Sequence, residues 1–308
     1  MLGYYKGCMP CRAVLALLAL FLCACQPPEG SHSKAIIGAV LIDGTSAPPL
    51  SDSVVVVGDG RIRAVGRRSS VEIPPEADKI DGSARFLAPV VIDICESASP
   101  PGLIHPANPE EARAQVAEAA ARKISIVHLG QTDRATVRAA MEAARAAGIP
   151  VTGHVSTEAG AKLLVENGAT SLVGMIRDSE ELDAAFVARL RNLQIVVAPA
   201  LVNAGSGLAV ASRNTRRLFQ AGVPLAVASE GGDPIREMEL LVEAGVPPLD
   251  AIVAATHNGA LALHQLEERG TIEAGKRADL VLLSANPGED IRNLRRVARR
   301  MVAGEWVR

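Results

Sequence analysis

Apolar residues near both ends of the chain form short runs that are typical of β-strands. These strand-like runs cover residues 35–43, 53–66, 278–283 and 297–307. Within the second run, Asp59-Gly60 separates a valine-rich half from an alternating half, which predicts a tight β-hairpin. We therefore expect residues 35–88 and 270–308 to form one small β-sandwich domain composed of both chain ends.

The middle of the chain alternates between strand-like and helix-like patterns. Short apolar runs occupy residues 90–94, 124–129, 150–154, 171–175, 195–199 and 224–229. Helical patterns lie between them, for example over 109–122 and 135–147. Repeated strand–helix units predict an α/β fold with a parallel sheet or barrel. Because a closed (β/α)₈ barrel needs eight strands and we count six runs, we expect a shortened TIM-barrel-like domain over residues 89–269.

The first residues have the pattern of a secretory signal. Basic Lys6 and Arg12 precede an almost purely apolar run over 13–24, and no acidic residue lies before it. A basic segment followed by a short apolar run is typical of a signal peptide, and this run is too short to span a bilayer comfortably. We expect residues 1–24 to be a signal peptide and 25–34 to be a linker.

The end of this signal resembles a bacterial lipobox. Residues 22–25 read LCAC, in which the last cysteine, Cys25, would receive lipid and become the first residue. The alternative is an ordinary signal peptide that is cut near Ala24. The first reading places the protein in the cell envelope, on the periplasmic face of the outer membrane, with lipid as its only membrane contact. Cys95 would then be the one free cysteine, so no internal disulfide framework is expected.

Composition narrows the classes of partner. Thirty-two Lys and Arg residues stand against 34 Asp and Glu residues, and the formal net charge is −2. A chain without a single-sign charge excess is not typical of a nucleic-acid-binding domain. Aromatic residues make up only 2% of the chain, which argues against base-stacking surfaces. A small-molecule substrate or ligand is the expected partner.

Several long segments resemble the amidohydrolase superfamily. Residues 35–66, AIIGAVLIDGTSAPPLSDSVVVVGDGRIRAVG, resemble its opening, and 251–297, which contain GTIEAGKRADLVLL, resemble its close. Residues 154–172 and 176–201 are similar to its middle. The most similar branch is the group of imidazolonepropionase-like and prolidase-like enzymes. Compared with typical members the chain is short between residues 97 and 123, where about two strand–helix units are missing.

This resemblance implies metal-dependent hydrolysis of carbon–nitrogen bonds, in a cyclic amide or a dipeptide. Members hold one or two divalent ions with a His-x-His pair, a Lys or Glu, two further His and an Asp. In this sequence those positions fall on Cys95, Ser97, Val127 or His128, His154, Gly174 and Glu230. Only one of the four histidines, His154, is kept.

Two explanations of this altered ligand set stay open. In the first, the chain keeps the fold but has lost the metal, and is a pseudoenzyme that binds a small molecule or a protein in the cell envelope. In the second, Cys95, His128, His154 and Glu230 form a remodelled site for one ion, for which zinc suits the donors best. Glu230 or Asp233 would then transfer protons. A third possibility is a truncated product that folds poorly.

Overall fold

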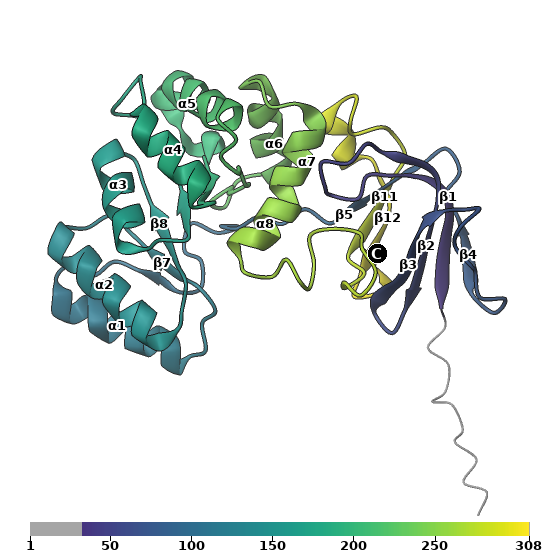
Figure 1. Cartoon of the computed structure of the whole chain (residues 1–308), viewed down its shortest axis with the longest axis horizontal. Helices are drawn as coiled ribbons and strands as arrows, with labels where there is room; N and C mark the ends of the chain where they lie inside the picture. The colour runs from purple at the N-terminus through teal and green to yellow at the C-terminus, as the bar shows by residue number, and fades with distance from the viewer. Residues whose placement is uncertain (1–32, 308) are drawn as a thin grey trace, which may run out of the picture. The chain divides into compact units, whose positions relative to one another are not determined.

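Strands from both ends of the chain form one eight-stranded sheet in the computed structural model, which describes residues 33–307 (Figure 1). Its strands are β1 (Lys34–Leu41), β2 (Leu50–Gly58), β3 (Arg61–Arg67), β4 (Asp78–Asp81), β5 (Phe86–Pro89), β11 (Leu280–Leu283), β12 (Val297–Val302) and β13 (Glu305–Val307). The order is β13-β12-β11-β5-β1-β2-β3, and β4 pairs with β1. The composite origin of this sheet is confirmed. The predicted signal peptide, the lipidated Cys25 and nearly all of the predicted linker lie outside the described residues.

Two hairpin turns from opposite ends of the chain meet in this sheet. Asp59 and Gly60 have φ values of 53° and 73°, and Ala303 and Gly304 have φ values of 47° and 81°. Two consecutive left-handed residues are the geometry of a type I′ turn, which suits the twist of the strands. A Cβ on Gly304 would lie 2.7 Å from the Cα of Gly60, so only glycine fits where the two turns touch.

The core of the sheet is apolar and closed to solvent. Its largest fully buried side chains include Ile36, Ile62 and Leu87 from the first part of the chain. They share one cluster with Leu280 and Met301 from the last part. Because each end supplies only part of this core, neither end can bury its apolar face without the other.

The central region alternates strands and helices as the sequence predicts. Its strands are β6 (Leu103–Ile104), β7 (Val127–Leu129), β8 (Val151–His154), β9 (Ser171–Val173) and β10 (Val196–Ala198). Its helices are α1 (Pro109–Ala121), α2 (Arg134–Ala147), α3 (Glu158–Asn167), α4 (Ala184–Asn192), α5 (Leu208–Gln220), α6 (Pro234–Glu243), α7 (Pro248–Ala255) and α8 (His257–Ala262). Short 3₁₀ turns are η1 (Leu201–Asn203), η2 (Gly205–Gly207) and η3 (Ile291–Arg295). The predicted helices over 109–122 and 135–147 match α1 and α2 to within one residue.

The parallel sheet of this region does not close into a barrel. Strands β6 to β10 pair in sequence order, and two isolated parallel bridges extend the row, Val197 with Leu225 and Val227 with Asp93. The expected strands over 90–94 and 224–229 are thus reduced to single bridges, and the two-residue β6 was not expected. Within residues 33–307, no strand pairs with the outer edge of β6. The incomplete barrel is therefore confirmed.

Alternation along the strands decides which side chains enter the barrel. On β7, Val127 and Leu129 belong to the large core under the helices, whereas His128 faces the other way. On β10, Val197 joins the same outer core while Val196 and Ala198 belong to a smaller inner cluster. The inner cluster is mainly alanine and valine, so the interior leaves room for polar groups.

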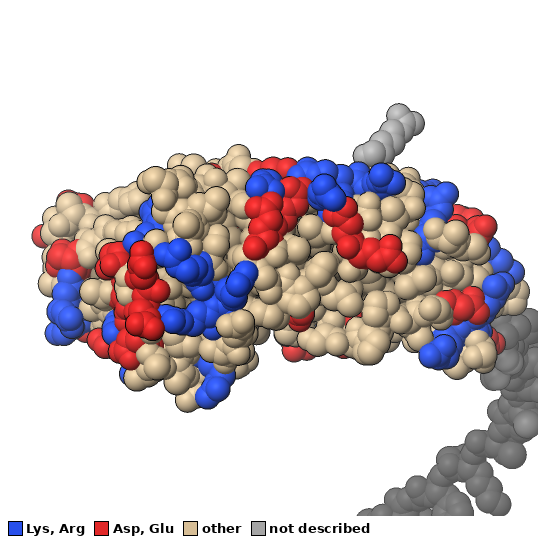
Figure 2. Space-filling view, turned by 90° about the horizontal axis from the view of Figure 1, so that it is seen from above, with Lys and Arg blue, Asp and Glu red and all other residues tan. Residues whose placement is uncertain are grey.

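Charges of both signs mix on the surface. Figure 2 shows Lys and Arg next to Asp and Glu on the face that it presents, with broad areas of other residues between them. This mixture agrees with the nearly balanced composition. Among residues 33–307, no helix combines the length and apolar character that crossing a bilayer requires.

Candidate metal centre

Three side chains with metal-binding atoms meet inside the open barrel. Ligand atoms of Cys95, His128 and His154 all lie within 4.8 Å of one another. Cys95 follows the bridge at Asp93, His128 is the inward residue of β7, and His154 is the last residue of β8. The carboxyl ends of parallel strands meet at one edge, which brings residues far apart in sequence together. The cluster contains three of the four residues that the sequence suggests as ligands.

Two nitrogen atoms of this cluster are buried without a hydrogen-bond partner. They are Nδ1 of His128 and Nε2 of His154. Buried polar atoms in folded proteins are almost always satisfied, so each unsatisfied one needs a physical explanation. Together with the nearby thiol of Cys95, they form a donor set of the kind that binds Zn²⁺. The residues present therefore fit a divalent ion.

Glu230 contacts the cluster through His154. Its Oε1 lies 3.3 Å from Nδ1 of His154, and its Oε2 lies 3.4 Å from Nδ2 of Asn203. The hydrogen bond with His154 lowers the pKa of Glu230, although burial opposes the shift. A carboxylate at Nδ1 favours the tautomer with its proton there, which leaves the lone pair on Nε2. Glu230 is outside the three-residue cluster, and its role as a direct ligand stays a prediction.

The environment sets the protonation of the other two side chains. Burial, with a smaller contribution from His154, lowers the pKa of His128 to about 4. Its imidazole is therefore neutral at pH 7 and can donate a lone pair. Burial, together with the charges of Glu230 and Asp93, raises the pKa of Cys95 to about 12. The thiol stays protonated at neutral pH unless a cation displaces its proton.

Asp93, which sequence reasoning left without a role, ties the two strand ends at the site together. Its carboxylate accepts hydrogen bonds from the backbone N–H of Cys95 at 2.9 Å and from the N–H and hydroxyl of Ser229. The N–H of Glu230 donates to the carbonyl of Cys95 at 2.7 Å. These contacts hold Glu230 at a φ of 47°. The signal that could have identified Asp93 is its place at the end of an apolar run.

Glu237 is a second residue that the sequence did not single out. Its side chain is fully buried on α6, where a core position is expected to be apolar. Its carboxylate accepts hydrogen bonds from the N–H groups of Leu201 and Val202, at 2.9 and 2.7 Å. Burial raises the pKa of Glu237 to about 7. Glu237 therefore fixes η1, the turn that presents Asn203 to Glu230.

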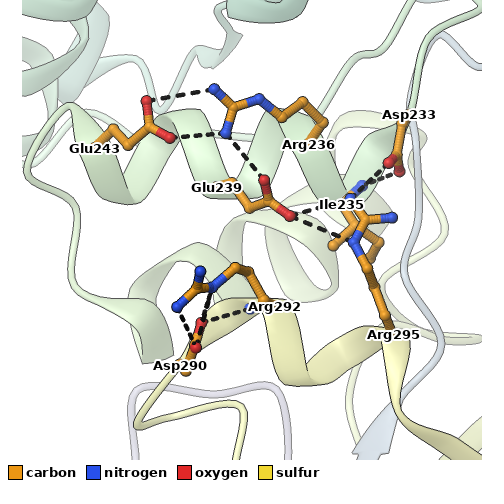
Figure 3. Close-up of polar contacts among 8 residues, drawn as sticks. All are labelled: Asp233, Ile235, Arg236, Glu239, Glu243, Asp290, Arg292 and Arg295. Atoms are coloured by element: carbon orange, nitrogen blue, oxygen red, sulfur yellow. Dashed lines mark hydrogen bonds and ion pairs between the residues drawn. The ribbon is translucent and has the colours of Figure 1, made fainter.

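Two further positions that the sequence analysis considered, Asp233 and Gly174, have structural roles. Asp233 is the N-cap of α6, where it accepts from the N–H of Ile235 at 2.9 Å. It also contacts Arg295 at 2.6 Å, at one end of a network of ion pairs (Figure 3). Its catalytic role stays a prediction. A Cβ on Gly174 would lie 2.4 Å from the carbonyl oxygen of Val155, so no ligand can occupy that position.

A small cavity opens beside the cluster at the carboxyl ends of the strands. We call it the mouth cavity; its volume is about 140 Å³. Polar side chains in its lining are Gln131, His154, Arg177, Asn203 and Glu230. His154 and Glu230 are thus the members of the site that meet solvent on this side.

The sequence is similar to proteins of one known family. Residues 107–307 match the sequence model of the amidohydrolase family. An imidazolonepropionase from a Geobacillus strain is 31% identical over 156 residues, which cover 47% of this chain and 36% of the relative. An imidazolonepropionase from Thermoplasma acidophilum is 28% identical over 235 residues, which cover 72% and 54%. The chain thus spans about a third to a half of the length of these relatives.

Solved structures share the fold at low sequence identity. The structure of molinate hydrolase superposes with a TM-score of 0.77 and 17% identity, covering 90% of this chain and 95% of the other. A Xaa-Pro dipeptidase with bound methionine also gives a TM-score of 0.77 and 17% identity, covering 89% and 99%. At such identity the likeness concerns the fold alone.

Proposed function

Because the chain belongs to the amidohydrolase family, we propose that it hydrolyses carbon–nitrogen bonds with one divalent ion held by Cys95, His128 and His154. The observation that carries the proposal is the pair of unpartnered buried nitrogens on His128 and His154 beside the thiol of Cys95. Each buried nitrogen without a hydrogen-bond partner lowers the stability of the protein by about 1–3 kcal/mol. A protein that binds no metal would gain nothing to offset this cost.

The residues around the cluster have separable tasks. When bound, the ion polarises the scissile carbonyl and lowers the pKa of a water molecule. His128 and His154 supply neutral nitrogen donors, and Cys95 supplies a thiolate after releasing its proton. Glu230 holds His154 in the required tautomer and, as a carboxylate facing the mouth cavity, can accept a proton and return it to the leaving nitrogen.

Metal content is the decisive measurement. The purified protein, loaded with Zn²⁺ and desalted, should retain about one ion per chain, as expected for a single three-ligand site. Cys95→Ala and His154→Ala should lose that ion. His264→Ala is the matched control, since this exposed histidine is hydrogen-bonded to the hydroxyl of Thr170, at 3.4 Å, and lies outside the cluster. Retention of zinc by both site variants, or absence of zinc in the parent protein, would contradict the proposal.

Proton release provides a second test of the ligand set. Zinc binding at pH 7 should release at least one proton, because Cys95 is protonated beforehand and loses its proton to the ion. Titration calorimetry in buffers of different ionisation enthalpy measures this number directly. If the protein unfolds cooperatively but binds no ion, the result would instead favour a catalytically inactive barrel that binds a small molecule or a protein.

We further infer that the protein works in the cell envelope, attached through lipid on Cys25. The support is the basic and apolar pattern of residues 1–24 followed by that cysteine. Metabolic labelling with a palmitate analogue should mark the parent protein and not Cys25→Ala. Equal labelling of both would contradict the anchor and leave the hydrolase proposal untouched.

A further inference from the structure

The opening in the barrel forms a second and larger cavity, which we call the seam cavity. Its volume is about 520 Å³, and it runs along residues 90–96 on one side and 123–126 on the other. These segments flank the gap between the bridge at Asp93 and the unpaired edge of β6. Cys95 and His128 also line the seam cavity. The cluster of Cys95, His128 and His154 therefore lies between the mouth cavity and the seam cavity.

Size distinguishes what the two cavities can hold. A water molecule takes about 30 Å³ in the liquid, so the mouth cavity, of about 140 Å³, has room for a few waters or a small fragment. Binding sites for organic ligands are typically about 300–1,000 Å³. The seam cavity falls in that range. The seam cavity therefore has room for the body of an organic ligand beside the cluster, whereas the mouth cavity is smaller.

Charge distinguishes the two ends of the seam cavity. Lys123, Arg269 and Arg300 line it, and within residues 33–307 none of the three makes an ion pair. Arg269 is half-buried, and only its Nε is occupied, by a hydrogen bond of 2.6 Å to Gln265. Unpaired cations that share a cavity attract an anionic group, and a guanidinium suits carboxylate or phosphate oxygens.

Acidic residues in the same lining offset this charge only in part. The carboxylate of Asp93 already accepts hydrogen bonds from Ser229 and Cys95. Glu96 attracts Arg269 without contacting it. Cys95 and His128, whose buried Nδ1 has no hydrogen-bond partner, line the cavity near the carboxyl ends of their strands. Arg300 pairs with Val281, which pairs with Ala88, and Lys123 precedes β7, so these two cations lie towards the amino ends. The cavity thus has basic groups at one end and the imidazole and thiol at the other.

We propose that the seam cavity binds an elongated organic anion, with its charged group at Lys123, Arg269 and Arg300 and its neutral end beside Cys95 and His128. This inference rests on the proposed function only in naming that ligand as the substrate. The substrate is then an amide that carries an anionic group away from the scissile bond. It enters through the side of the barrel rather than through its mouth.

The test is a binding measurement on the full-length protein after treatment with EDTA, so that its result does not depend on metal or activity. Glutaramate, which has one carboxylate and one neutral amide end, is the anionic probe. Glutaramide is its neutral counterpart of the same length, and inorganic phosphate is the bare anion. Calorimetric titration should show saturable binding of glutaramate, with glutaramide at least tenfold weaker. Weaker binding of phosphate than of glutaramate indicates that the neutral part of the ligand also contributes, as an elongated ligand requires.

Substitutions locate the binding. Arg300→Ala should weaken glutaramate binding at least tenfold, and its folding is not at risk because Arg300 is exposed. The matched control is Arg299→Ala on the same strand, whose guanidinium lies 4.2 Å from the centre of the Trp306 ring and does not line the cavity. Arg269→Gln keeps a polar side chain at the half-buried position and should also weaken binding at least tenfold.

Three results would overturn the inference: no saturable binding of glutaramate, equal binding of glutaramide, or an equal loss in Arg299→Ala and Arg300→Ala. Zinc content is measured on the same preparations. Anion binding without zinc would contradict the proposed function and support the seam cavity. Zinc binding without anion binding would support the proposed function and contradict the inference about the seam cavity.

Discussion

The terminal sheet and the open barrel differ in the kinds of side chain that they bury. The sheet buries large aliphatic side chains such as Ile36 and Leu87 in a core of paired strands. The barrel interior is lined by small side chains and also contains His128, Thr152 and Ser171, all buried. Thr152 and Ser171 satisfy each other at 2.7 Å, whereas His128 keeps an unpartnered nitrogen.

This difference shows where stability and chemistry reside. Apolar burial contributes about 25 cal/mol per Å², so the sheet core contributes to stability without any ligand. Buried polar groups in the barrel lower stability until something pairs with them. A protein can tolerate such groups when another region supplies the stabilising burial, and the cost is recovered when a ligand binds.

The largest expected effect comes from the sheet core. Leu87→Ala removes a fully buried side chain and should lower the free energy of unfolding by about 2–5 kcal/mol. Cys95→Ala in the barrel interior removes a single sulfur atom and should cost the metal-free protein about 1 kcal/mol. Urea denaturation of both variants measures the difference. A larger loss for Cys95→Ala would reverse the assignment of stability to the sheet.

Buried titratable groups should give the barrel a pH dependence that the sheet core lacks. His128 has a pKa lowered from 6.5 to about 4, so its contribution to stability is present above pH 6.5 and is lost as pH falls towards 4. Glu237 has a pKa raised from 4.5 to about 7, so its contribution is present below pH 4.5 and is lost as pH rises through 7. Each change amounts to roughly 3 kcal/mol.

Single variants separate these opposing slopes in the metal-free protein. Glu237→Gln should leave the His128 slope, so stability should rise from pH 4 to 6.5. His128→Asn should leave the Glu237 slope, so stability should fall from pH 4.5 to 7. Denaturant midpoints across this range are the measurement, with Leu87→Ala as the control that keeps both groups. Parallel profiles for the two variants would show that these groups are not buried as described.

Helix capping around the barrel should have a smaller effect. Asp133 is the N-cap of α2 and accepts from the N–H groups of Ala135 and Thr136 at 2.8 and 3.1 Å. Asp133→Ala removes these two bonds and a third from the hydroxyl of Thr136, and should lower the free energy of unfolding by about 1 kcal/mol. Asp133→Asn is the matched control and should recover most of that loss, because its side-chain oxygen can cap in the same way.

The smallest effect is expected where η3 meets α6. Arg295 contacts Asp233 at 2.6 Å and Glu239 at 3.0 Å, and Arg236 contacts Glu239 and Glu243 (Figure 3). Exposed ion pairs contribute about 0–1 kcal/mol. Arg295→Ala should therefore change stability by less than about 1 kcal/mol, and the difference should vanish in 1 M NaCl, where the Debye length is about 3 Å. A loss that persists in salt would mean that Arg295 acts through packing.

Sequence reasoning located elements better than it located contacts between them. The Asp59-Gly60 turn and the helices over 109–122 and 135–147 depend on residues close together in the chain, so the local pattern was enough to predict them. The assignment of the family's lysine position was ambiguous between Val127 and His128, because a shift by one residue reverses the face of a strand. The structure resolves it, since Val127 packs outward and His128 inward.

The sequence by itself determined the alternating α/β pattern, the composite terminal sheet and the short list that contains Cys95, His128 and His154. Only the tertiary structure decided that these three meet, that Asp233 caps α6, and that Glu237 is buried under η1. It also decided that the barrel stays open beside Asp93. The physical reason is range. Hairpins and caps depend on neighbouring residues, whereas the cluster of candidate ligands and the cavity depend on strands that are separated in the chain and placed together by packing.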